Sequence, residues 1–261
     1  MIDALSLAVL VFFLAFIFEL IDSSCGQGYG TLGSPAFILL GISPKLVVPA
    51  ILVSQAVGGL VATRMHNKWG NASFWVKEGG KRKLGSDVKH MLVIAAAGIV
   101  GVVFASFVGI KISTDLLTAY IGILVLAIGL LLLAGLALKF TWKKMMGIGL
   151  VSAFNKGLSG GGYGPVVCGG QMVCSVEGKK AVAVTAFSEV PICLTGFLAW
   201  MYFGYNPQVF GIAIPMILGA VCGALIGPWI TFKAHSKKFN TSLGVILVVL
   251  GVLTLLRVLN P

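Results

Sequence analysis

A glycine-rich stretch that occurs twice constrains this chain more than any other feature of its sequence. The first copy, residues 25–35, reads CGQGYGTLGSP, and the second, residues 159–165, reads SGGGYGP. Their shared Gly-Tyr-Gly motifs begin at positions 28 and 162, which differ by 134. One shared tripeptide means little in a chain with 35 glycines, so the interpretation depends on further matches at that offset.

Three further pairs of residues match at the same offset with no gap. They are Lys45 and Lys179, Ser54 and Ser188, and Gln55 and Glu189. These matches indicate an internal duplication, which predicts two similar structural units. We therefore expect a first repeat over residues 1–138 and a second repeat over residues 139–261.

The composition places the duplicated chain in a membrane. Hydrophobic residues make up 58% of the 261 residues and charged residues 10%, with a mean hydropathy of +1.02. Soluble domains carry about 25% charged residues, so a soluble fold is excluded. The many glycines fit this interpretation, because small residues let helix backbones approach closely in lipid. The expected fold is an all-α polytopic membrane protein.

Ten apolar segments follow one another along the chain and divide into two sets of five. A spanning helix needs about 20 apolar residues. The segments are 4–22, 31–43, 45–63, 91–110 and 116–138 in the first half, and 145–158, 165–176, 181–203, 209–232 and 243–259 in the second. Each half thus has four long segments and one short segment, which follows the glycine-rich turn. The polar stretch 66–90 carries Trp69, Phe74 and Trp75, which predict a piece lying at the membrane interface.

The distribution of Lys and Arg predicts the topology. If each short segment crosses the membrane, four loops face the same side, namely 64–90, 139–144, 179–180 and 233–238. These loops hold 15 of the 19 Lys and Arg residues, in a chain of net charge +11. Basic residues concentrate on the cytoplasmic side and meet anionic lipids there. We expect a cytoplasmic basic loop at 66–90, and no nucleic-acid partner, because no basic patch with interleaved aromatic residues forms a domain.

Five crossings in each half have a consequence for the symmetry of the fold. An odd number of crossings inverts the second repeat relative to the first, as in many secondary transporters. Both termini are then expected outside the cytoplasm. We predict two inverted repeats, each with four long transmembrane helices and one short or broken helix at a glycine-rich turn.

The two glycine-rich turns are the expected substrate site. Gly28, Gly30, Gly162 and Gly164 leave backbone N–H groups accessible at the start of a short helix, where anions bind. Irregular backbone in lipid is tolerated only where it is buried in protein or lines a cavity. Paired broken helices mark the substrate site in inverted-repeat transporters. Alternatively, these glycines only permit tight turns and close packing.

Polar residues beside the turns complete the expected substrate-binding set. Tyr29 and Tyr163 either donate a hydrogen bond to an anion or anchor the turns at an interface. The other candidates are Thr31, Ser34, Gln55, Ser188 and Cys168, which matches Ser34 at the offset of 134. Cys25 lies in the first turn and is the expected accessible thiol and the candidate reactive thiol.

Charged residues within membrane spans are costly and are functional candidates. Asp22 and Lys156 occupy the same register in the two halves with opposite charge. Lys156 forms a structural ion pair with Asp22 or attracts the substrate. Glu189 replaces Gln55 and, together with Asp22, is the candidate for proton coupling, because such a carboxylate must change its protonation state. Glu19, near the end of the first span, is interpreted as an interface residue.

Taken together, these residues resemble the sulfite exporter TauE/SafE family, also called the toluene-sulfonate uptake permease family. The resemblance is carried by GQGYG at 26–30, Pro35, Gly41, Pro44, Ser54 and Gln55, then by GGGYGP at 160–165 with Ser188 and Glu189. Gln27 interrupts the run of consecutive glycines that is usual in the family. The resemblance spans nearly the whole chain. It implies transport of sulfite, sulfonates or sulfoacetate-like anions across the bacterial inner (plasma) membrane, most often as export.

Two other classes of function remain as alternatives. A membrane sulfur-transfer protein would use Cys25 or Cys168 as a reactive thiol. An anion channel would conduct the same ions without a saturable carrier step. The sequence contains no metal motif, no catalytic-triad spacing and no cofactor fingerprint, so we favour a transporter with no enzyme activity, metal or cofactor.

The topology is tested with reporters fused after Pro261. We expect a reporter that folds only outside the cytoplasm to be active after Pro261. The two halves together cross the membrane ten times, which returns the chain to the side where it started. The same reporter inserted in the basic loop 66–90 serves as the inactive control. Activity of a cytoplasm-only reporter after Pro261 would contradict the inverted arrangement.

Overall fold

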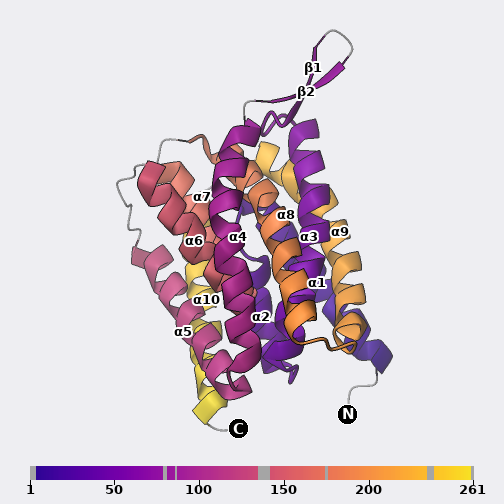
Figure 1. Ribbon diagram of the computed structural model, residues 1–261, viewed down its shortest axis with the longest axis vertical. Helices are drawn as coiled ribbons and strands as arrows, with labels where there is room; N and C mark the ends of the chain where they lie inside the picture. The colour runs from indigo at the N-terminus through magenta and orange to yellow at the C-terminus, as the bar shows by residue number, and fades with distance from the viewer. Residues whose placement is uncertain are drawn as a thin grey trace.

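The computed structural model describes residues 4–78, 81–85, 87–134, 142–173, 176–233 and 238–259. Over these residues the chain forms ten helices and one hairpin. In chain order they are α1 (Ala4–Cys25), α2 (Tyr29–Leu39), α3 (Pro44–Lys68), β1 (Trp75–Glu78), β2 (Lys81–Leu84), α4 (Asp87–Lys111), α5 (Thr114–Ala134), α6 (Trp142–Ser159), α7 (Tyr163–Val173), α8 (Gly178–Phe203), α9 (Val209–Lys233) and α10 (Lys238–Leu259). The expected all-α polytopic architecture is confirmed (Figure 1).

Over the described residues each predicted apolar segment coincides with one helix, although several helices extend beyond their apolar part. Residues 135–138 and 174–175 of the predicted segments lie outside the described residues. Among the described residues, α1, α3, α4, α5, α8 and α9 are long and apolar enough to cross a membrane, and 245–258 in α10 is a shorter apolar helix. Two predicted ends were too early, because α1 continues to Cys25 and α3 to Lys68. Hydropathy marks where a helix leaves lipid. The ends of α1 and α3 are instead set by a glycine with positive φ just after each of these two helices, Gly26 at 74° and Gly70 at 71°.

The polar stretch after α3 forms an antiparallel hairpin. Trp75 of β1 pairs with Leu84 of β2, and Glu78 pairs with Lys81. Phe74, just before the hairpin, is fully buried, and its ring lies 4.8 Å from that of Phe187 in α8. The hairpin projects from one end of the bundle, and α1 begins and α10 ends at the opposite end (Figure 1).

The helices of the two halves interlock. Helix α1 packs against α9, and α6 packs against α4, while α3 and α8 contact each other in the centre and α5 packs against α10. Figure 1 shows α3 running toward the hairpin end and α8 away from it, and α4 running away from that end and α9 toward it. Helices α3 and α8 therefore run in opposite directions, and so do α4 and α9.

Two constant offsets relate the contacts of the two halves. Lys45 donates a hydrogen bond to the carbonyl of Ile110 at the end of α4 (3.2 Å), and Lys179 donates one to the carbonyl of Phe232 at the end of α9 (2.9 Å). The lysines differ by 134 positions and their acceptors by 122. The second offset is smaller because the hairpin lengthens the connection between α3 and α4. Both lysines place a cation at a helix C-terminus, where the helix dipole favours it.

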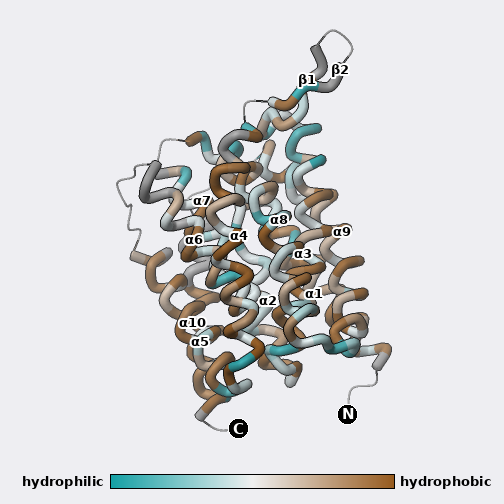
Figure 2. Tube along the Cα trace, viewed as in Figure 1, coloured by the Kyte–Doolittle hydropathy of each residue, from teal (hydrophilic) through white to brown (hydrophobic). Residues whose placement is uncertain are grey.

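Hydrophobic side chains cover the outside of the bundle. Exposed apolar residues occur on the long helices, for example Phe13 on α1, Phe104 on α4, Leu130 on α5 and Leu218 on α9. Figure 2 shows hydrophobic residues along the helices and hydrophilic ones near the hairpin. An apolar exterior around a polar centre is what a lipid solvent requires.

Glycines let α9 approach α1 closely and let α4 approach α6 closely. A methyl group at Gly223 of α9 would lie 2.6 Å from the carbonyl oxygen of Phe16 in α1. At the matching place, a methyl group at Gly101 of α4 would lie 2.7 Å from the carbonyl oxygen of Leu150 in α6. Such backbone contacts are a principal source of helix association in lipid, where apolar burial supplies little drive.

A substitution at Gly219 of α9 tests this packing. A methyl group there would lie 2.3 Å from the carbonyl oxygen of Phe12. We expect Gly219→Ala to destabilise the protein by about 1–3 kcal/mol, because overpacking a tight contact forces the backbone to shift. Thermal unfolding in detergent measures the effect. Gly211→Ala in the same helix meets no atom within 4 Å and is the control, which should unfold at the wild-type temperature or above. Equal unfolding temperatures for the two variants would contradict the close contact.

Candidate functional site

The two glycine-rich turns meet in the middle of the structure, backbone against backbone. A methyl group at Gly30 would lie 1.7 Å from the carbonyl oxygen of Gly160, and one at Gly164 would lie 2.5 Å from that of Gly26. The two contacts are related by the offset of 134. Only glycine fits at positions 30 and 164 in this conformation, so the packing role considered for these glycines is real.

Side chains repeat the contact between the turns. Ser34 of α2 donates a hydrogen bond to the carbonyl of Ser159, at the end of α6. The equivalent Cys168 of α7 points its Sγ at the carbonyl of Cys25, at the end of α1, at 3.7 Å. Each short helix is thus attached to the turn of the other half. In addition, Thr31 accepts a hydrogen bond from the backbone N–H of Gly162 (3.2 Å).

The two tyrosines of the Gly-Tyr-Gly motifs point inward. The Tyr29 hydroxyl lies 2.7 Å from the hydroxyl of Ser54 in α3, and the Tyr163 hydroxyl donates to Ser188 in α8 at 3.0 Å. Both rings are 1% exposed. They attach the start of each short helix to the next long helix of the same half, so neither tyrosine is an interface anchor. Ser54 was not among the predicted site residues.

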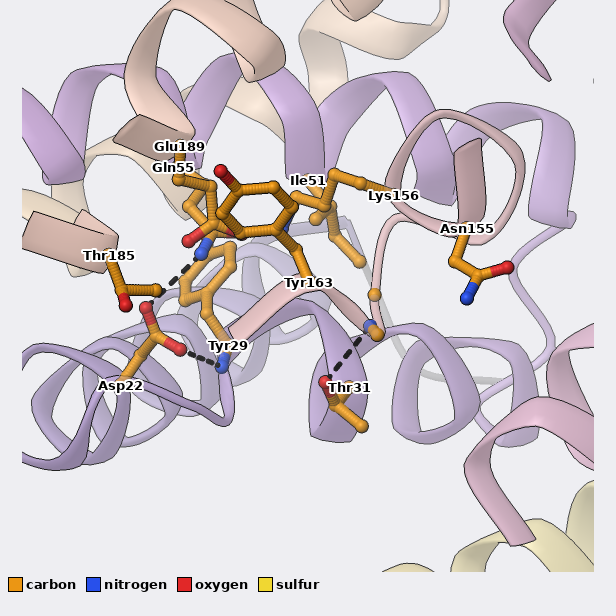
Figure 3. A network of polar contacts seen from close by, with 12 residues as sticks. Asp22, Tyr29, Thr31, Ile51, Gln55, Asn155, Lys156, Tyr163, Thr185 and Glu189 are labelled. Carbon is orange, nitrogen blue, oxygen red and sulfur yellow. Dashed lines mark hydrogen bonds and ion pairs between the residues drawn. The ribbon is translucent and has the colours of Figure 1, made fainter. Parts of the chain in front are cut away.

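A chain of four polar side chains crosses the centre between the halves (Figure 3). The Lys156 ammonium lies 2.8 Å from Oε1 of Glu189 and also donates a hydrogen bond to Oε1 of Gln55. The amide nitrogen of Gln55 lies 3.2 Å from Oδ2 of Asp22. The four residues are two offset-related pairs, Asp22 with Lys156 and Gln55 with Glu189. The sequence left a pair between Asp22 and Lys156 open, but Lys156 takes Glu189 as its ion-pair partner, and Gln55 bridges to Asp22.

The two short helices begin in different electrostatic surroundings. Oδ1 of Asp22 accepts a hydrogen bond from the backbone N–H of Tyr29 (3.2 Å), so a carboxylate lies at the N-terminus of α2. The equivalent residue beside α7 is Lys156, a cation. A helix N-terminus carries partial positive charge. The α2 N-terminus therefore already holds the carboxyl group of Asp22, whereas the residue at the matching position in the second half is the cation Lys156.

The structure brings the predicted site residues together as one buried cluster. All twelve residues of the predicted substrate-binding set are buried, namely Gly28, Tyr29, Gly30, Thr31, Ser34, Gln55, Lys156, Gly162, Tyr163, Gly164, Cys168 and Ser188. Asp22 and Glu189 are buried beside them, whereas Cys25 is half-buried. Cys25 and Cys168 are both free thiols. Within the described ranges, no group of three or more His, Cys, Asp and Glu residues has a geometry that suits a metal ion.

Glu19 is the residue that the sequence interpretation misplaced. It was assigned to the membrane interface, but its side chain is 1% exposed and lies between α1, α3 and α9. The assignment failed because α1 continues past Asp22 to Cys25, which moves Glu19 into the interior. The signal was present, since Glu19 and Asp22 are three positions apart and share one helix face.

Comparison with known proteins agrees with the resemblance seen in the sequence. The profile of the sulfite exporter TauE/SafE family matches residues 11–254. This chain belongs to the sulfite exporter TauE/SafE family. It is also similar to the probable membrane transporter protein YtnM of Bacillus subtilis strain 168, with 21% identity over 262 residues that cover 94% of this chain and 81% of the relative. No solved structure matches the chain. TauE/SafE membership and the six span-length helices indicate a multi-pass membrane protein of the transporter kind.

The buried ion pair of this TauE/SafE protein is tested by removing one or both partners. Lys156→Met leaves the Glu189 carboxylate buried and unpaired, which we expect to cost about 3–5 kcal/mol. The double variant Lys156→Met, Glu189→Leu removes both charges, and we expect it to unfold at a higher temperature than the single variant.

The control for this pair is an ion pair near the surface. Lys180→Met breaks the pair between Lys180 and Asp87, in which the lysine side chain is 31% exposed and the aspartate side chain 5%. We expect a smaller loss there than in Lys156→Met, because Lys180 is partly in solvent and Asp87 keeps its hydrogen bond from the backbone N–H of Ser73. Thermal unfolding in detergent gives all three values, and a double variant no more stable than Lys156→Met would argue against the pair.

Proposed function

We propose that the protein is a proton-coupled secondary transporter that moves a small sulfur-containing anion, such as sulfite, a sulfonate or a sulfoacetate-like ion, across the bacterial inner membrane. The observation that carries the proposal is the buried chain Asp22, Gln55, Lys156 and Glu189 at the junction of two glycine-rich turns. Ionisable groups buried in a membrane protein mark substrate or proton pathways. Family membership supports the substrate class.

The proposed transporter is built from two inverted repeats, residues 1–138 and 139–261, with both termini outside the cytoplasm. Three observations support this arrangement. The contacts of the turns recur at an offset of 134, the lysine caps recur at both ends of the bundle, and α3 and α4 run opposite to α8 and α9. In such transporters one half rocks against the other around a central site.

The proposed anion site lies at the start of α7, beside Lys156. Lys156 is the one cation in the chain of four, and the α7 N-terminus adds partial positive charge. The equivalent place at α2 is already taken by Asp22. In the described conformation the turns touch, so we interpret it as a closed state. The anion enters when the contact between Gly30 and Gly160, or that between Gly26 and Gly164, opens.

The proposed coupling is a competition for Lys156. An ionised Glu189 holds the ammonium at 2.8 Å, so an anion has to displace it. When Glu189 binds a proton, the ion pair is lost and Lys156 becomes available to the anion. Proton and anion then bind together, with Asp22 as a second proton acceptor. The direction of flux follows the two gradients, and we propose export from a cell in which the anion accumulates.

A thiol-dependent sulfur-transfer function is the second candidate. It is favoured by the place of Cys25 and Cys168, which meet where the turns contact each other. The double variant Cys25→Ala, Cys168→Ala distinguishes the two functions. Saturable anion flux through this variant excludes the thiol function, and single-channel currents in a planar bilayer would instead indicate a channel.

The transport function is tested in proteoliposomes with labelled sulfite and, separately, methanesulfonate. We expect saturable uptake that a pH gradient stimulates. Glu189→Gln keeps the hydrogen bond to Lys156 but cannot exchange a proton, so it should lose stimulation by the gradient and retain anion exchange. Glu177→Gln, at the exposed start of the same helix, is the matched control and should behave as wild type. Unchanged pH dependence in Glu189→Gln would remove Glu189 from the mechanism.

A further inference from the structure

Glu19 is a buried carboxyl group that the proposed coupling chain does not use. It lies on α1, one turn before Asp22, with 1% of its surface exposed. Its Oε2 has no hydrogen-bond partner among the residues that the structure describes. An unpaired carboxylate in an apolar interior is strongly unfavourable, so the group is stable there as the neutral acid.

Two glycines make room for this carboxyl group. A methyl group at Gly58 of α3 would lie 3.2 Å from the Glu19 carboxyl carbon, and one at Gly223 of α9 would lie 3.0 Å from its Cβ. The same hypothetical methyl at Gly58 would lie 3.1 Å from Cβ of Ala220 in α9. Glu19, Gly58 and Ala220 therefore form a three-residue contact between α1, α3 and α9.

The second half of the molecule contains the same contact without a carboxyl group. The offset of 134 takes positions 19 and 58 to Ala153 and Ile192, and the offset of 122 takes position 220 to Gly98. These three residues also meet, because a methyl group at Gly98 would lie 2.7 Å from Ile192 and 2.9 Å from Ala153. The equivalent space is filled there by the side chain of Ile192.

The comparison of the two contacts shows whether packing alone requires a carboxyl group at position 19. In the first half the large residue is the polar Glu19, which faces a glycine and an alanine. In the second half the large residue is the apolar Ile192, which also faces an alanine and a glycine. The volume at the junction is similar, and an apolar set of residues fills it. Packing therefore does not require a carboxyl group at position 19, and a buried ionisable group in a membrane interior is costly unless it is used.

The charged groups that act on Glu19 come from three helices. They are Asp22 on α1 itself, Glu189 on α8 and Lys156 on α6. Helix α3 presents Gly58 and α9 presents Ala220 and Gly223 at the contact, which add no titratable group. Glu19 thus lies at the edge of the polar chain that contains the cation Lys156. It is three residues before a second acid, Asp22.

We propose that Glu19 is a second proton-carrying carboxyl group of the transport cycle, neutral in the closed conformation and deprotonated when the halves separate. The proposal rests on the transport function proposed above. It assigns an additional proton to each cycle and places it in the first half only. Opening moves α1 and α3 of the first half relative to α9 of the second half. This motion exposes Oε2 of Glu19 to water, where the ionised carboxylate is no longer unfavourable.

The experiment uses Glu19→Gln in two measurements. Infrared difference spectra of the purified protein after a pH jump report the carbonyl stretch of protonated carboxylic acids, and we expect the variant to lack one component of the wild-type band. Proteoliposomes report the number of protons moved per anion, and we expect one fewer in the variant with anion exchange retained. Glu177→Gln should leave both values unchanged.

The outcomes separate this proposal from the transport function. An unchanged infrared band in Glu19→Gln overturns the proposal, and so does a lost band with an unchanged proton count. Absence of sulfite and methanesulfonate flux in the wild-type protein overturns the transport function instead. In that case the proposal falls with the transport function, and loss of the infrared component shows only that Glu19 is a carboxyl group whose protonation changes with pH.

A second variant, which copies the contact of the second half, controls for the possibility that Glu19→Gln misfolds. The triple variant Glu19→Ala, Gly58→Ile, Ala220→Gly installs the three side chains of Ala153, Ile192 and Gly98. We expect it to unfold close to the wild-type temperature, to exchange the anion and to move one fewer proton per anion. Wild-type proton movement through this variant would overturn the proposal.

Discussion

Direct contact between two stretches of bare backbone is the constraint on which the rest of this structure depends. Gly30 and Gly164 have no side chain, so each lies against a carbonyl of the other turn. The contact brings the short helices α2 and α7 together, and with them Tyr29 and Tyr163. The polar chain from Asp22 to Glu189 is continuous only because the turns are this close. A membrane protein cannot rely on apolar burial to hold such a junction, and tight glycine packing replaces it.

Much of the fold could be predicted from the sequence, because lipid imposes a simple rule on composition. Ten apolar segments predicted ten helices, and a fixed offset of 134 predicted which ones correspond. The helix ends and the hairpin could not be predicted in this way, since both depend on hydrogen bonds and glycine conformations in polar stretches. Gly26 and Gly70 set the ends of α1 and α3 regardless of hydropathy.

The sequence predicted which residues lie together at the candidate site but not which of them contact each other. Asp22, Gln55, Lys156 and Glu189 stood out as polar residues in apolar surroundings, and they do form one cluster. Which residue pairs with which depends on distances of a few ångströms, which periodicity does not encode. Lys156 pairs with Glu189, and Gln55 lies between Lys156 and Asp22. Glu19 was misplaced because its depth depended on where α1 ends.

The duplicated contact between the turns has a mechanical consequence. Gly30 lies against Gly160 and Gly164 lies against Gly26, so the two turns touch at two separate places. If one contact opens while the other stays closed, the halves rotate relative to each other about the closed contact. In the transport cycle that we propose, such a motion would open the site to one side of the membrane at a time without a separate gating element.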